Sequence, residues 1–96
     1  MKMIELRHTF DSEFDEIIDN IMIELTKAEC KHPEWPDDIV HNAGIVIEEA
    51  GEAMRAALNT YYENENIEEL KKELAQTGST VIRFLLFIER KERGII

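Results

Sequence analysis

Apolar residues recur every three or four positions along most of this chain, which is the spacing of an amphipathic helix. The recurrence runs through a first segment until Pro33 stops it, and it returns in two later segments separated by the polar turn ENEN at residues 63–66. The pattern predicts an all-α protein with three main helices, at about residues 12–31, 38–62 and 67–91, in a single domain of residues 1–96.

The helix ends carry residues suited to capping. Asp11 or Ser12 can cap the first helix, and Asp37 or Asp38 can cap the second. Residues 1–7 alternate roughly between apolar and polar, so we expect a brief strand or an extended arm there. The connection HPEWPDD holds both prolines and the only tryptophan, which makes it a stiff link between the first two helices.

The stretch VIRFLLFI at residues 81–88 is apolar on almost every side of the third helix and is interrupted only by Arg83. A helix that is apolar all round must be covered all round, and two other helices of one chain do not easily achieve this. We therefore expect a homodimer or a dimer of dimers, in which a four-helix-type core is completed by dimerisation.

Charge and composition narrow the choice of partner. The formal net charge of −10 argues against nucleic acid and against an acidic membrane surface, because both attract Lys and Arg. The start of the chain lacks an apolar signal segment, and the longest apolar run is too short to span a bilayer. With a single cysteine, Cys30, the chain fits a reducing compartment, and we expect a cytoplasmic protein.

The second helix crowds three carboxylates, Glu48, Glu49 and Glu52, into the stretch IVIEEAGEAM. Like charges at this spacing destabilise a helix, so the crowding requires a reason. On a helical wheel Glu48 and Glu52 share a polar stripe with His41, whereas Glu49 lies between that stripe and the apolar face. The face expected to form the core comprises Ala43, Val46, Ala50, Ala53, Met54, Ala57 and Tyr61.

The third helix also has a polar stripe, formed by Glu69, Glu73, Gln76 and Thr80, apart from an apolar face of Leu70, Leu74, Val81 and Ile88. A short turn makes the two helices antiparallel, so Glu49 and Glu52 can face Glu73 and Gln76. Carboxylates that share a site need protonation or a cation, and oxygen ligands alone favour Mg²⁺, with Mn²⁺ as substitute. Mg²⁺ also takes phosphate oxygens, which indicates a nucleotide or another polyphosphate. The alternative is a solvated acidic helix face.

The motif IEEAGE, a spacer of twenty residues and the motif ELAQ together resemble the EExxE…ExxD signature of MazG-type all-α nucleotide pyrophosphohydrolases. The flanking sequence resembles short, phage- or prophage-borne MazG-like proteins, and the resemblance covers about residues 35–88. It implies a helical bundle, dimeric or a dimer of dimers, that hydrolyses a nucleoside triphosphate, NTP or dNTP, to the monophosphate and diphosphate with Mg²⁺.

By position, the resemblance implies that Glu49, Glu52 and Glu73 are metal ligands. Glu48 would hold a further metal or the attacking water, and Glu48 or Glu52 would receive the proton of that water. The fourth ligand of the family is Asp, and here Gln76 takes its place; its carbonyl can bind a metal or a metal-bound water but adds no charge.

Two other functions remain open. The substitution at Gln76 favours a catalytically weak or inactive helical dimer that acts as an interaction or regulatory module. A di-iron carboxylate bundle ranks last, because it requires Glu-x-x-His pairs on facing helices that this sequence does not supply.

Five further residues are candidates for binding substrate. Trp35 can stack on a nucleobase, although it can equally anchor the connection to the core, and His41 can touch phosphate or base, or make a bond at the helix start. Arg55, Lys72 and Arg83 can hold phosphates. Ion pairs on the helix surface explain the first two as well, and a salt bridge across a dimer interface explains the third.

Overall fold

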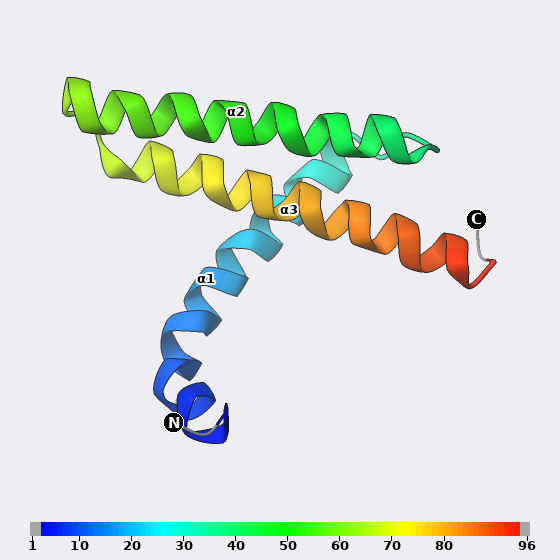
Figure 1. The fold of residues 1–96 in the computed structure, drawn as a ribbon, viewed down its shortest axis with the longest axis horizontal. Helices are drawn as coiled ribbons and strands as arrows, with labels where there is room; N and C mark the ends of the chain where they lie inside the picture. Colours follow the sequence, from blue (N-terminus) through cyan, green and yellow to red (C-terminus); the bar gives the residue numbers. More distant parts are fainter. Residues whose placement is uncertain (1–2, 95–96) are drawn as a thin grey trace.

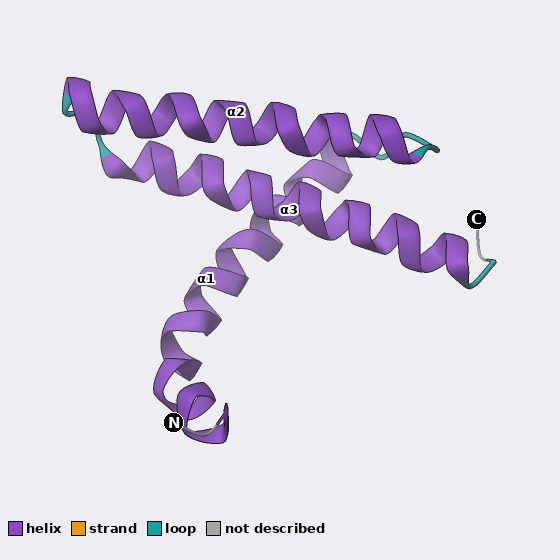
Figure 2. Cartoon of the chain, viewed as in Figure 1, coloured by secondary structure: helices purple, strands orange, loops and turns teal. Residues whose placement is uncertain are grey.

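A computed structural model describes the backbone of residues 3–94 and the side chains of residues 12–94. Three helices, α1 (Met3–Lys31), α2 (Ile39–Glu63) and α3 (Ile67–Glu92), follow one another along the chain (Figure 1). Residues 3–94 contain no strand (Figure 2). The predicted all-α architecture with three helices is confirmed. None of these helices, over the described residues, is long and apolar enough to cross a bilayer.

The first helix begins earlier than the sequence predicted. α1 starts at Met3, so the strand or arm expected for residues 1–7 is wrong from residue 3 onward, and residues 1–2 lie outside the described part. Asp11 and Ser12 lie inside the helix and do not cap it. The apparent alternation was too short to define a strand, because a helical spacing of three and four also runs through the segment at Met3, Leu6, Phe10 and Phe14.

α2 and α3 form an antiparallel hairpin, and α1 packs against α3 while its first half extends away from the hairpin (Figure 1). Asp38 caps α2 as predicted, since its carboxylate accepts the backbone N–H of His41 at 2.8 Å. α2 ends at Glu63, and its C-cap Asn64 turns the chain with a left-handed φ of 56°. Asn66 caps α3, since its side-chain oxygen accepts the backbone N–H of Glu68.

The interior of the single chain is largely polar. Only four apolar side chains are buried among residues 12–94, namely Leu25, Ala53, Ala56 and Phe87. Four polar or charged residues are buried beside them, namely Asn42, Ser79, Thr80 and Arg83. The faces by which α2 and α3 meet are therefore mixed, with Ala53 and Ala56 buried on α2 and Ser79 and Thr80 buried on α3, whereas His41, Glu48 and Glu52 of the polar stripe of α2 are exposed.

The core faces predicted for α2 and α3 are only partly buried in the single chain. Of the face expected on α2, Ala53 is buried, but Met54 is 59% exposed and Tyr61 is also exposed. Leu74 and Val81 of the face expected on α3 are exposed as well. Helical periodicity distinguishes two faces of a helix, but it does not say which face packs within the chain.

Each helix of the hairpin consequently carries an exposed apolar row, and we call these two rows the outer apolar rows. Their members follow one another at intervals of seven, four or three residues, which places them on one side of each helix. The row of α2 comprises Ile47, Met54, Leu58 and Tyr61, and the row of α3 comprises Ile67, Leu74, Val81 and Leu85. Nothing within the described part of the chain covers these side chains.

Candidate metal centre

Three carboxylates meet where α2 crosses α3. Glu49 and Glu52 of α2 and Glu73 of α3 each place one carboxylate oxygen within 4.8 Å of the other two. The spacing of three residues puts the two glutamates of α2 on one side of that helix, and the buried Ala53 leaves room beside them. The structure thus brings together the three acids that the sequence predicted to meet.

Two of the carboxylate oxygens lack any partner. Oε2 of Glu49 and Oε2 of Glu73 are buried and accept no hydrogen bond. A buried acceptor left unpaired costs about 1–3 kcal/mol, and more when the group is charged. Both oxygens lie next to other carboxylates of the cluster, so a proton, a hydrogen-bond donor or a cation is the partner that suits them. A hard cation with oxygen ligands fits this donor set.

The ionisation of two of these glutamates is disfavoured. Burial raises the pKa of Glu49 above its ordinary value, and the charges of Glu52 and Glu48 raise this pKa further. Burial likewise raises the pKa of Glu73, and the charge of Glu52 and contacts with Glu69 add to the rise in this pKa. Without a cation, the cluster therefore tends to hold protons that isolated glutamates would release.

Gln76 is directed toward α1. Its Nε2 donates a hydrogen bond of 3.4 Å to Oε2 of Glu24, a residue of α1 whose side chain is only 14% exposed. Gln76 and Glu24 also line one cavity with Glu49. Glu24 did not stand out in the sequence, although it follows Ile17 by seven residues and so occupies the apolar side of α1, where a glutamate is unusual.

The other acids and bases near the cluster are more exposed. Glu48 is exposed and lies beside Glu49 on the outer edge of the cluster. Arg55 lines a cavity of about 250 Å³ together with Glu52 and Glu73, so it lies within the site. Lys72 is exposed on α3.

His41 and its neighbour Asp38 form the start of α2. Nδ1 of His41 lies 2.5 Å from Oδ2 of Asp38, and the backbone N–H of His41 lowers the pKa of that aspartate. The bond at the helix start, one of the two roles predicted for His41, is therefore present.

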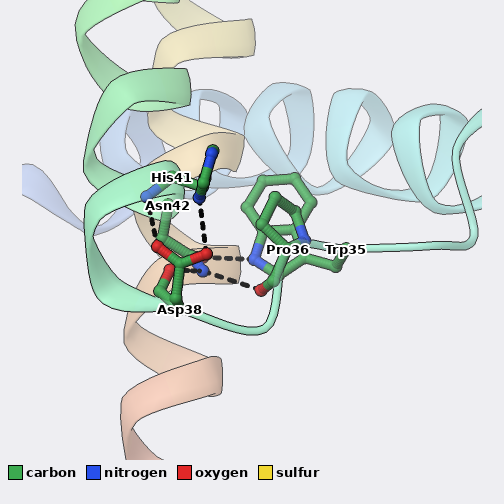
Figure 3. Close-up of polar contacts among 5 residues, drawn as sticks. All are labelled: Trp35, Pro36, Asp38, His41 and Asn42. Atoms are coloured by element: carbon green, nitrogen blue, oxygen red, sulfur yellow. Dashed lines mark hydrogen bonds and ion pairs between the residues drawn. The ribbon is translucent and has the colours of Figure 1, made fainter.

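Trp35, in the connection between α1 and α2, contacts Asn42 of α2 and Arg83 of α3. Nε1 of Trp35 donates to Oδ1 of Asn42, and Nδ2 of Asn42 donates to the carbonyl oxygens of Pro36 and Asp38 at 2.9 and 2.8 Å (Figure 3). Arg83 lies over the indole, with its Cζ 3.9 Å from the ring centroid.

The anchoring role predicted for Trp35 is thus confirmed, whereas stacking on a base stays a prediction. Arg83 also donates to the carbonyl oxygen of His32 at 3.1 Å, which ties α3 to the connection. Sequence reasoning missed Asn42, the only large side chain that is fully buried among residues 12–94. A single asparagine at a helix start carries no signal that would have indicated this role.

No protein-family model, no curated protein and no solved structure matches this chain. Its function is therefore inferred from the glutamate cluster and from the resemblance of its two motifs to the MazG-type signature.

The raised pKa values of Glu49 and Glu73 give a testable pH dependence. A carboxyl group whose pKa is higher in the folded state than in the unfolded state destabilises the fold when it is ionised. For Glu49 and Glu73 this destabilisation is largest above the raised pKa, and it disappears as the pH falls to the ordinary pKa of 4.5. We therefore expect the melting temperature of the metal-free protein to rise by a few degrees when the pH is lowered from 7 to 5. Millimolar Mg²⁺ should flatten this rise.

Lower net charge stabilises an acidic protein by itself, so the comparison requires variants. The double substitution Glu49→Gln with Glu73→Gln should flatten the pH profile, whereas Glu63→Gln with Glu65→Gln, two exposed acids at the hairpin turn, should leave it steep. The melting temperatures are measured by circular dichroism at each pH. If the melting temperature depends equally on pH in the two double variants, the glutamate cluster is not the source of the pH dependence.

Proposed function

We propose that this protein is a Mg²⁺-dependent nucleoside triphosphate pyrophosphohydrolase that releases a nucleoside monophosphate and diphosphate and so controls a nucleotide pool. One observation carries the proposal: Glu49, Glu52 and Glu73 meet, and one buried carboxylate oxygen of Glu49 and one of Glu73 have no hydrogen-bond partner. A cation would supply the partner that these oxygens lack, and a hard cation with open positions takes phosphate oxygens. The resemblance of IEEAGE and ELAQ to the MazG-type signature supplies the reaction.

In the proposed mechanism Glu49, Glu52 and Glu73 hold Mg²⁺, for which Mn²⁺ can substitute. When bound, the cation neutralises charge on the phosphates and lowers the pKa of water. Water attacks the first phosphorus in line, the bond from that phosphorus to the bridging oxygen breaks, and diphosphate leaves with that oxygen. Glu52 or Glu48, both on the exposed edge of the cluster, accepts the proton of the water.

We further propose that the active form is a homodimer or a dimer of dimers. The outer apolar rows support this, because intervals of seven and four residues are the spacing with which helices of a bundle pair. A second copy that lays its own rows on these would cover the side chains that the single chain leaves in solvent. It would also complete the four-helix-type core expected for the MazG-like bundle.

The alternative function is a helical dimer with little or no catalytic activity that acts as an interaction or regulatory module. The bond from Gln76 to Glu24 favours it, because an amide engaged in that way adds no charge to the centre. For either function the free thiol of Cys30 fits a reducing compartment such as the cytoplasm.

Calorimetric titration with Mg²⁺ and Mn²⁺, followed by a screen for diphosphate release from canonical and modified triphosphates, tests the proposal. We expect binding at millimolar concentration or below, with monophosphate and diphosphate as the products. Absence of metal binding at millimolar concentration would overturn the proposed activity. Metal binding without hydrolysis of any triphosphate would favour the regulatory module.

A further inference from the structure

A cavity of about 290 Å³ lies beside the glutamate cluster, between α1 and the hairpin. Glu49 and Gln76 line its side on the hairpin, whereas Glu24, Lys27, Lys31 and His32 line the side contributed by α1 and the residue after it. In a chain with a net charge of −10, two lysines facing this cavity are conspicuous. Sequence reasoning had assigned phosphate contacts to Arg55, Lys72 and Arg83 and had overlooked both lysines.

The two lysines lie on one side of α1, because they are four residues apart. A chain of contacts that begins on α3 reaches Lys27, whose side chain is 68% exposed. Nζ of Lys27 lies 3.6 Å from Oε1 of Glu24, and the second oxygen of Glu24 accepts the hydrogen bond from Nε2 of Gln76. Gln76 thereby sets the position of a cation on the neighbouring helix, which an aspartate would not do, because it would repel Glu24.

The charges on the two sides of the cavity complement a polyphosphate. A cation held by Glu49 and its neighbours can take only a few phosphate oxygens, and the remaining negative charge of a triphosphate needs further positive groups. Lysine binds phosphate as a flexible point charge. Arg83, by contrast, is occupied by Trp35 and the carbonyl oxygen of His32.

We propose that this cavity is the subsite for the diphosphate part of the substrate, with Lys27 and Lys31 binding the second and third phosphates and the diphosphate that is released. Gln76 is then a positioning residue that acts on Lys27 through Glu24, and it is not a metal ligand. This inference rests on the proposed function, because it assigns the groups that bind the leaving part of the same substrate.

The test measures binding of inorganic diphosphate to the full chain by calorimetry in the presence of Mg²⁺, and binding of Mg²⁺ alone. The double substitution Lys27→Gln with Lys31→Gln should weaken diphosphate binding about tenfold or more, which corresponds to about 1.4 kcal/mol. Mg²⁺ binding should not weaken. Lys27→Arg with Lys31→Arg, which keeps both charges, should restore most of the diphosphate affinity.

The matched control is Lys71→Gln with Arg93→Gln, which removes the same charge from exposed positions on α3 and at its C-cap. An equal loss in the two Gln variants would show a general charge effect and overturn the subsite. If the wild-type protein binds Mg²⁺ and the Lys27→Gln with Lys31→Gln variant binds diphosphate as tightly as the wild type, this inference alone is overturned. Wild-type protein that binds no Mg²⁺ would instead overturn the proposed function.

Gln76→Ala separates the two roles of the amide. A positioning role predicts weaker diphosphate binding and a raised KM, with Mg²⁺ affinity in the absence of diphosphate within about twofold of the wild type. A fall in Mg²⁺ affinity that equals the fall in diphosphate affinity would make Gln76 a ligand and overturn the positioning role.

Discussion

Glu49→Gln is expected to abolish metal-dependent hydrolysis, with a loss of at least about 100-fold in kcat/KM and of most Mg²⁺ affinity. Glu49 supplies one of the three oxygens that meet within 4.8 Å, and its Oε2 is buried without a partner. The substitution keeps the size of the side chain and removes the charge, so a positioned cation loses an anionic ligand. Removal of a single electrostatic contact in an active site typically costs about 100- to 1,000-fold in rate.

The same substitution should raise the melting temperature of the metal-free protein, because it removes a carboxylate whose ionised form destabilises the fold. A rise in stability together with loss of activity separates a damaged site from a damaged fold. Glu63→Gln, which removes an exposed acid at the end of α2, serves as the control and should change neither quantity appreciably. Triphosphate hydrolysis that survives Glu49→Gln would refute the assignment of this residue as a ligand.

Leu85→Lys is expected to prevent dimer formation. Leu85 is 60% exposed in the single chain and belongs to the outer apolar row of α3. Burial of a leucine side chain stabilises by about 1.5–3 kcal/mol, and a two-fold interface contains the residue twice. The dissociation constant should therefore rise by at least about 100-fold, which sedimentation velocity over a range of protein concentrations can measure.

Ile39→Lys is the matched control, since Ile39 is equally apolar and 63% exposed but, at eight residues before Ile47, lies off the outer apolar row of α2. It should leave the dissociation constant within a few-fold of the wild type. Leu85→Met, which conserves volume, should also remain dimeric. A wild-type protein that sediments as a monomer at high micromolar concentration would refute the dimer, and equal dissociation by the two lysine variants would refute the placement of the interface.

Much of the fold followed from local pattern. The spacing of apolar residues predicted three helices, and the cap at Asp38 was predicted from residue type alone. The meeting of Glu49, Glu52 and Glu73 also followed, because an antiparallel hairpin with a short turn aligns positions that lie at similar distances from that turn. Such inferences need only the geometry of one helix or of two joined helices.

The contacts that the sequence did not predict join distant parts of the chain. Gln76 lies 52 positions from Glu24, and Arg83 lies 51 positions from His32, so no local period connects either pair. The core faces predicted for the hairpin were only partly right for a related reason. A helical wheel shows that Met54 and Glu49 point to different sides, but it does not show which side packs within the chain and which is left for a second chain.

The exposed outer apolar rows have a consequence for how much working protein a cell contains. With so few apolar side chains buried inside one chain, folding of a single chain gains little, and under the proposed pairing the two chains fold as they associate. At concentrations below the dissociation constant, the amount of folded dimer then grows with the square of the number of chains. A twofold rise in expression would then give about a fourfold rise in activity. The activity would therefore depend more steeply than linearly on the amount of protein made.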